Sequence, residues 1–285
     1  MLISADMEGT CGVVAWVQVM PPEYAASGRL VAAGEYERAR LRMTLEVNAA
    51  IEGALAGGAE EVIVNDSHDG MRNLLLDDLH PTCRLISGED KALGMAQGVD
   101  LADIGALFFT GYHAKAGTPA APLAHTWTGW LADVRFDGQS VGEWGLNAAV
   151  AGHFGVPVMF VAGDDQAVAQ TRAYCGDHVV GVAVKEGIST FAALHLHPER
   201  ARSLIRAGAE AATRRAIASP VPPTVFPANC PVEIHFDHQA RADQAIYVRG
   251  VERIGERSIR YHPADALEMI YTFNAIVQAA SIKVS

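Results

Sequence analysis

The stretch 106–113, ALFFTGYH, is a short apolar run that ends in a glycine and two polar side chains. Apolar runs of this length are typical of strands that are buried on both faces, as in parallel sheets. Apolar runs that end in polar or acidic residues recur at 2–5, 61–65, 156–162 and 179–184. We therefore predict an α/β fold with a mainly parallel sheet and flanking crossover helices.

Helix-period segments separate these predicted strands. One helix of about 20 residues is expected to end at the Gly57-Gly58 pair, and its leucines and isoleucine should face the sheet on one arc. The residues of that arc are Leu41, Leu45, Ile51 and Leu55. A second helix is predicted from Gly142 to Gly155, and a long one from Ser189 to Ser219.

Residues Trp130–Glu143 predict a β-hairpin insertion instead, because Asp137-Gly138 suits a two-residue type I′ turn. The hairpin should therefore interrupt the alternation of strands and helices.

A smaller C-terminal α+β unit is predicted after a proline-rich stretch, since prolines cannot continue the long helix. These prolines are Pro220, Pro222, Pro223 and Pro227. Strands are expected at 232–236 and 258–261, followed by a final helix with Leu267, Ile270 and Val277 facing inward. We expect an α/β metal-binding catalytic domain over 1–187 and the α+β unit over 188–285, with the final helix packing back.

Composition restricts the function classes. The chain has 285 residues and a net charge of -11, from 22 Lys plus Arg against 33 Asp plus Glu, so no nucleic acid partner is expected. No apolar run approaches the roughly 18 residues that suggest a membrane span. The four cysteines lie far apart, and no leader precedes the first strand, so we predict a cytoplasmic protein with reduced thiols.

Two acidic side chains follow the first predicted strand. Asp6 and Glu8 are two residues apart, so an extended backbone places both carboxylates on the same side. Such a pair is costly near a buried strand end unless a cation neutralises it. An exposed acidic turn is the alternative, and for Asp-x-Glu alone it is the better interpretation.

Histidines follow two other strands. His68 ends VIVNDSH and His113 ends FFTGYH, while His125 lies in the loop AHTWTGW before the hairpin. Imidazole suits zinc, and in an open α/β sheet ligands bind beyond the carboxyl ends of the strands. The alternatives are a solvated His68, with Asp66 capping the next turn, and hydrogen-bonded core histidines.

Glu143 begins the helix that follows the hairpin, with Asn147 one turn later on the same face. Glu143 can simply favour the positive end of that helix, or it can be a ligand that faces the crevice with Asn147 supporting it. Each signal is weak alone. Two histidines and three carboxylates at strand ends together match a two-metal hydrolase, in which one carboxylate bridges the ions.

Seven short motifs in order and spacing resemble the DppA-type D-aminopeptidase family. They are ADMEG, VNDSH, GYHA, the GTP loop, VGEWGLNA, VAGDD and AVKEGIS. The resemblance is strong over roughly residues 1–190 and looser beyond. Seven motifs in register are far more specific than any one of them.

The resemblance implies a peptidase that holds two divalent ions, with zinc favoured over manganese or cobalt. The positions that match the family's ligands are Asp6, Glu8, His68, His113 and Glu143. It places Asp6 between the two ions and makes His125 the catalytic residue, as nucleophile, general base or transition-state stabiliser. It further implies short peptides with an N-terminal D-residue, such as D-Ala-D-Ala, as substrates, and a ring-like homo-oligomer, a decamer.

Two segments, Val14–Glu35 and Pro122–Trp130, are bulkier or more apolar than this family pattern, and we predict that both line the substrate entrance. Substrate side chain, stereochemistry and peptide length therefore do not follow from the resemblance. Two other functions remain open: a metal-dependent amidase or phosphoesterase of another small molecule, and a non-catalytic dipeptide-binding protein. The sequence has no Arg cluster and no glycine-rich phosphate-binding loop near the motifs, which argues against the phosphoesterase.

Overall fold

The predicted parallel sheet is present in the computed structural model, which describes residues 1–21 and 33–284. Its seven strands lie in the order β3-β2-β1-β4-β7-β8-β9. Their bounds are β1 (Leu2–Ala5), β2 (Ile63–Asp66), β3 (Arg84–Ile86), β4 (Leu107–Tyr112), β7 (Val158–Asp164), β8 (Val180–Ser189) and β9 (Ala192–His195). All neighbours are parallel except β9, which pairs antiparallel with β8. All five strands predicted from apolar runs are confirmed.

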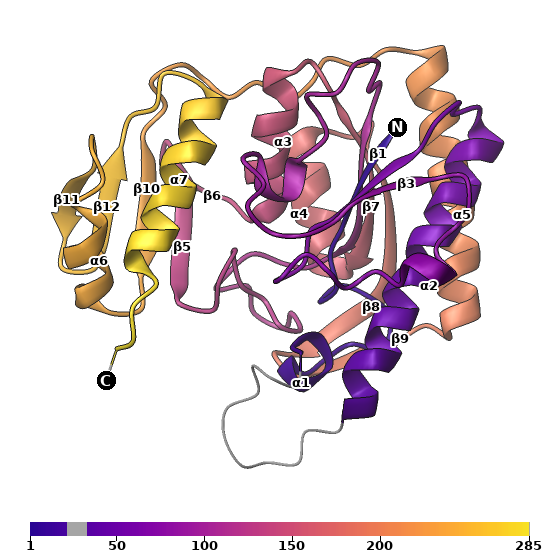
Figure 1. Cartoon of the computed structure of the whole chain (residues 1–285), viewed down its shortest axis with the longest axis horizontal. Coiled ribbons are helices and arrows are strands. Elements are labelled where there is room, and N and C mark those ends of the chain that lie inside the picture. The colour runs from indigo at the N-terminus through magenta and orange to yellow at the C-terminus, as the bar shows by residue number, and fades with distance from the viewer. Residues whose placement is uncertain (22–32, 285) are drawn as a thin grey trace.

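Helices cover both faces of this sheet (Figure 1). On one face lie α2 (Ala33–Gly57) and α5 (Pro198–Ala218), whose Val47 and Ile205 share a core with Ile3 and Phe108. On the other lie α3 (Glu143–His153) and α4 (Asp165–Cys175). There Leu146 of α3 packs with the strand side chains that point to this second face. This period-two alternation between two cores is what a sheet buried on both faces requires.

Two details of the predicted helices were wrong. The long helix begins at Pro198 rather than Ser189, because residues 185–189 pair with 192–195 in a β-hairpin. On α2, Leu41 is 41% exposed and does not face the sheet. α5 lies so close to α2 that a Cβ on Gly53 would overlap the main chain of Arg206, and this contact sets the buried face of α2.

A second, antiparallel sheet has the order β11-β12-β10-β5-β6. Its strands are β5 (Leu131–Phe136), β6 (Gln139–Ser140), β10 (Val232–Phe236), β11 (Glu252–Gly255) and β12 (Ser258–Tyr261). The predicted hairpin is β5 and β6, and both turn residues, Asp137 and Gly138, have positive φ. The hairpin therefore pairs with strands that come after the prolines, and the division of the chain at residue 187 stays a prediction.

Helix α7 (Ala266–Ala280) joins the two halves of the molecule. It packs against α3 and against α6 (Gln239–Ala245), so it lies between the antiparallel sheet and the parallel one (Figure 1). Ile270 is fully buried, as predicted, while Leu267 and Val277 are partly buried. Within 1–21 and 33–284, no helix is both long and apolar enough to cross a bilayer.

Candidate metal centre

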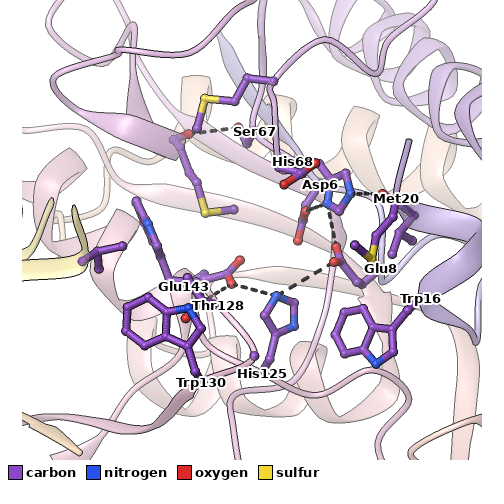
Figure 2. A pocket seen from close by; sticks show the side chains of 17 residues that line it. Asp6, Glu8, Trp16, Met20, Ser67, His68, His125, Thr128, Trp130 and Glu143 are labelled. Atoms are coloured by element: carbon purple, nitrogen blue, oxygen red, sulfur yellow. Dashed lines mark hydrogen bonds and ion pairs between the residues drawn. The ribbon is translucent and has the colours of Figure 1, made fainter. Parts of the chain in front are cut away.

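Three neighbouring strands bring the predicted ligands together. β2, β1 and β4 are adjacent and parallel, so their carboxyl ends meet at one edge of the sheet. Asp6 and Glu8 follow β1, His68 follows β2 and His113 follows β4. Glu143, the first residue of α3, faces the same space (Figure 2).

Glycines allow the chain after β1 to lie directly against the end of β4. The Gly9 amide donates to the Gly111 carbonyl at 2.7 Å. A Cβ on Gly9 would overlap the Tyr112 carbonyl, and one on Gly111, which has φ +67°, would overlap the Asp6 carbonyl. This close approach places Asp6 within reach of His113.

Asp6 lies between the two histidines and presents one carboxylate oxygen to each. Its Oδ1 is 3.2 Å from Nδ1 of His68, and its Oδ2 is 3.4 Å from Nε2 of His113. Glu8 Oε2 is 2.9 Å from the same His68 nitrogen, and Glu143 Oε2 is 3.3 Å from the same His113 nitrogen. Bonds of about 2.0–2.2 Å in a tetrahedral zinc site separate ligand atoms by about 3.3–3.5 Å. The separations here, 2.9–3.4 Å, are at or slightly below this range, so the donor atoms are close enough together to hold two ions with Asp6 shared.

Main-chain carbonyls orient the three histidines. His68 Nε2 is 2.7 Å from the carbonyl of Val19, at the end of α1 (Trp16–Val19). Nδ1 of His113 is 2.9 Å from the carbonyl of Ala114, and Nδ1 of His125 is 2.9 Å from the carbonyl of Leu123. Because a carbonyl only accepts, each of these nitrogens carries a proton, so the other ring nitrogen is the one that faces the site and can coordinate an ion.

The carboxylates are buried with histidines as their ion-pair partners. Among the described residues, no Lys or Arg forms an ion pair with Asp6, Glu8 or Glu143. Asp6 Oδ2, Glu8 Oε2 and His113 Nε2 are buried and have no hydrogen-bond partner. Buried charges normally are paired or coordinate metals, so this donor set fits divalent cations.

Burial and the negative charge of Glu8 raise the pKa of Asp6 to about 7. Burial works in the same direction on Glu8 and Glu143, but His68 and His113 respectively outweigh it and lower the pKa of each carboxyl. The same carboxylates hold the pKa of His68 and His113 well above its usual value despite burial. When no metal cation is bound, protons on these side chains therefore supply the positive charge of the cluster.

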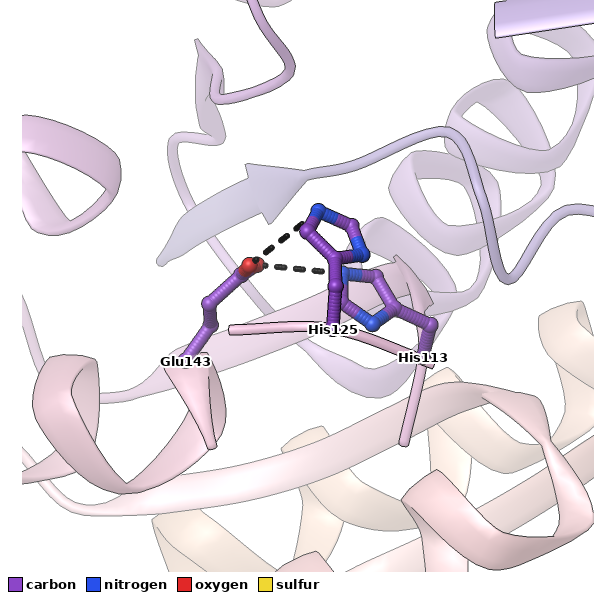
Figure 3. A group of neighbouring side chains, drawn as sticks. All are labelled: His113, His125 and Glu143. Carbon is purple, nitrogen blue, oxygen red and sulfur yellow. Dashed lines mark ion pairs between the residues drawn. The ribbon is translucent and has the colours of Figure 1, made fainter. Parts of the chain in front are cut away.

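His125 differs from the other two histidines. Its ring stacks on His113 at 4.1 Å between centroids and 7° between planes (Figure 3). Its Nε2 is 3.9 Å from Glu8 Oε1 and 3.8 Å from Glu143 Oε1. Burial and the neighbouring His113 lower the pKa of His125, which favours a neutral imidazole. His125 also forms a possible ion-binding group with His113 and Glu143.

Asn147 does not have the supporting role predicted from the sequence, whereas Asp66 caps a turn, as one of the two interpretations predicted. Asn147 donates to the Tyr112 hydroxyl at 2.9 Å rather than supporting Glu143, whose Oε1 instead accepts from the Trp127 amide at 2.6 Å. Asp66 accepts from the amides of Asn73 and Leu74, so it caps the turn after β2.

Sequence reasoning missed the role of Lys185. Its ammonium is fully buried and donates to the carbonyls of Glu8, Thr10 and Val13, which fixes the chain that carries Glu8. Its position within AVKEGIS was the available signal.

A cavity of about 480 Å³ opens onto the cluster. Both bulky segments noted in the sequence contribute to its lining, through Trp16, Val19 and Met20 and through Trp127 and Trp130; residues 22–32 of the first segment lie outside the described part. Besides the carboxylates and histidines, the lining is rich in tryptophan and methionine, and no Lys or Arg of the described ranges is among it. The cavity therefore suits a small organic molecule with apolar groups.

An α/β sheet whose strand ends gather three carboxylates and three histidines beside such a cavity defines a metallohydrolase. The model of the D-aminopeptidase family matches residues 1–275, and the chain belongs to this family. It is 37% identical over 269 residues to the D-aminopeptidase of Bacillus subtilis (strain 168), covering 93% of this chain and 92% of the relative. The solved structure of the Zn-dependent D-aminopeptidase DppA from Bacillus subtilis, described as a self-compartmentalizing protease, matches with a TM-score of 0.88 and 33% identity, covering 100% of this chain and 98% of that one.

Proposed function

We propose that this D-aminopeptidase holds two zinc ions, with Asp6, Glu8 and His68 around one and Asp6, His113 and Glu143 around the other. The observation that carries the proposal is the Asp6 carboxylate, whose two oxygens face different histidines at 3.2 and 3.4 Å. Zinc is favoured because the solved relative is described as Zn-dependent and because imidazole and carboxylate donors suit it.

Bound ions would supply Lewis acidity for a scissile carbonyl and for an attacking water. The protein's part is to fix the ligands: the Val19 and Ala114 carbonyls hold the proton of each histidine on the nitrogen that faces away from the site. The Trp127 amide holds Glu143, so this carboxylate does not need to reorganise.

His125 is the proposed catalytic residue. It is neutral, and its unprotonated Nε2 faces the space between Glu8 and Glu143. An imidazole in this state can take a proton from the attacking water and return it to the leaving amine, a role that commonly contributes about 10²–10⁴-fold. We therefore assign His125 the role of general base and acid.

The substrate is a short peptide with a free N-terminal D-residue. The absence of Lys or Arg from the described lining of the cavity disfavours a phosphate ester, and Asp69, a lining carboxylate outside the ligand set, is available to a cationic amino group. A dipeptide-binding role without catalysis leaves the ion-ligand geometry unexplained.

We also propose that the chain forms a homo-oligomer, because its solved relative is described as self-compartmentalizing. Light scattering on the purified chain tests this assembly, with a decamer as the specific prediction. A cytoplasmic location stays a prediction.

The experiment that tests the activity combines metal analysis with a substrate panel. We expect two zinc ions per chain, release of D-alanine from D-Ala-D-Ala, slower cleavage of L-Ala-L-Ala, and no hydrolysis of a phosphate monoester. Asp6→Asn keeps the side-chain shape and should lose both metal and activity. A metal-loaded protein that cleaves the phosphate ester but neither dipeptide would refute the proposal.

A further inference from the structure

The cavity has apolar walls on two sides of the metal-type cluster. Trp16 and Met20 form one wall, and Trp16 lies edge-on to His125 at 5.3 Å. Met95, Trp127, Trp130 and Val277 also line the cavity but pack with the other core, that of α3 and α7, and we call these four residues the α7 wall. Figure 2 shows Trp16 and Trp130 on opposite sides of the cluster.

Trp127 in the α7 wall is packed from behind. Its indole meets Phe273 of α7 in a T-shaped contact at 5.2 Å between centroids. It also covers Gly94, where a Cβ would lie 2.8 Å from the ring. Trp127 is held at φ +66°, a conformation uncommon for a bulky residue. The indole is therefore fixed between the 3-10 helix Gly94–Ala96 and the C-terminal helix.

Trp130 is packed in the same way. It stacks on Phe236 of β10, with 6.1 Å between centroids, and the Arg241 guanidinium lies 4.5 Å from its ring. The other two members of the wall are Met95, which is 4% exposed, and Val277, which is partly buried on α7. The α7 wall is therefore a preformed apolar surface built from both halves of the chain.

This wall is coupled directly to the cluster. The main-chain amide of Trp127 donates to Glu143, so the residue that carries this indole is hydrogen-bonded to a proposed metal ligand. In an aminopeptidase only one residue lies on the amino side of the bond that is cut. The side chain of that residue therefore lies at a fixed place beside the bond, whereas the rest of the peptide can vary in length.

We propose that the α7 wall receives the side chain of the substrate's N-terminal residue and selects a large apolar one, such as leucine or phenylalanine, over alanine. The inference rests on the proposed peptidase function and names its substrate class. A methyl group would leave most of this apolar surface uncovered, whereas a leucine or phenylalanine side chain can bury itself against it. Such burial corresponds to about 10- to 100-fold in kcat/KM.

The test compares D-Phe, D-Leu and D-Ala amides with one leaving group on the zinc-loaded full-length chain. We expect kcat/KM for D-Phe and D-Leu to exceed that for D-Ala by at least about tenfold. Equal values, or a preference for D-Ala, would overturn the inference.

Variants of α7 locate the effect. Val277→Trp fills the space at the wall and should lower the D-Phe to D-Ala ratio of kcat/KM about tenfold or more. Gln278→Trp adds the same bulk at the next, exposed position and should leave the ratio unchanged. If Val277→Trp does not fold, the smaller enlargement Val277→Leu should lower the ratio in the same direction. A folded Val277 variant with the parental ratio contradicts the assignment.

A binding measurement separates this inference from the proposed function. If no amide is hydrolysed, the peptidase proposal fails, but calorimetry with D-phenylalaninamide and D-alaninamide still decides the role of the wall. Tighter binding of the phenyl compound, weakened by Val277→Trp, supports it. Equal affinity refutes it.

Discussion

Removing metal should destabilise the protein by a measurable and pH-dependent amount. Three buried atoms, Asp6 Oδ2, Glu8 Oε2 and His113 Nε2, have no hydrogen-bond partner in the structure. Each unsatisfied buried polar group costs about 1–3 kcal/mol, so cations can relieve up to several kcal/mol. Independently, one ion present at about 1,000 times its Kd adds about 4 kcal/mol to the free energy of unfolding. For a chain of 285 residues, whose entropy of unfolding is about 0.6 kcal/mol/K, that corresponds to a fall in Tm of about 7 °C on chelation.

The size of this fall should increase with pH. The metal-free protein has a raised pKa at Asp6, to about 7, and at His68 and His113. Because the pKa of each group is higher in the folded state than in the unfolded state, bound protons stabilise the metal-free fold. This stabilisation is lost as the pH rises above the unfolded-state pKa and through the folded-state pKa. The same protons compete with metal ions, so metal affinity increases over that range. The difference in Tm between loaded and chelated protein should therefore be larger at pH 8 than at pH 6.

Thermal unfolding followed by circular dichroism, before and after treatment with EDTA, measures both effects. Added zinc should restore the original Tm, and metal analysis should establish that the ions were removed. Asp6→Asn serves as the matched variant and should show a much smaller response to zinc. An unchanged Tm at pH 8 in protein shown to be free of metal would refute the reasoning.

Three further substitutions test separate parts of the site. His125→Ala should lower kcat by about 10²–10⁴-fold with metal content retained, and unchanged turnover would remove this residue from the mechanism. Gly111→Ala should lower the free energy of unfolding, measured in urea, by more than the roughly 1–2 kcal/mol that a left-handed alanine costs, because the added Cβ overlaps the Asp6 carbonyl. The control Gly117→Ala also has positive φ but open space around it, so it should cost only about 1–2 kcal/mol. Tyr112→Phe removes a buried hydroxyl that bonds two side chains and should cost about 1–3 kcal/mol with little change in KM; a neutral effect would show that these bonds are replaced.

The strands and the ligand positions could be predicted because both depend on local patterns. A buried parallel strand requires an apolar run, and the first polar residue after it lies at the edge where ligands bind. Asp6 and His113 are the first residues after β1 and β4, and His68 is the second after β2. The sheet order, which places these three strands side by side, is a tertiary property that no local pattern contains.

The errors arose where long-range packing outweighs local preference. Residues 189–197 contain good helix formers, yet 192–195 pair with β8 as an edge strand because β8 extends to Ser189. Leu41 falls on an apolar arc of α2, but the close contact of α5 at Gly53 determines which side of the helix is buried. Helical periodicity identifies an apolar stripe on a helix, but the element that packs against the helix determines which side of it is buried.

The site's orienting groups are invisible to sequence reading for a different reason. Each of the three histidines is held by a main-chain carbonyl, from Val19, Ala114 and Leu123, and a carbonyl is the same group whatever the side chain. These positions therefore carry no compositional signal, although they decide which imidazole nitrogen faces the ligands.

The two halves of the chain contribute different physical properties to one cavity. The loops that follow the parallel strands supply its charged groups, while α7 supplies Val277 and, through Phe273, supports Trp127. Metal affinity depends mainly on charge and donor geometry, whereas selectivity among apolar side chains depends on the shape of a surface. Changes on α7 can therefore alter which substrate is accepted without altering the ligand set, because no residue of α7 is a proposed metal ligand.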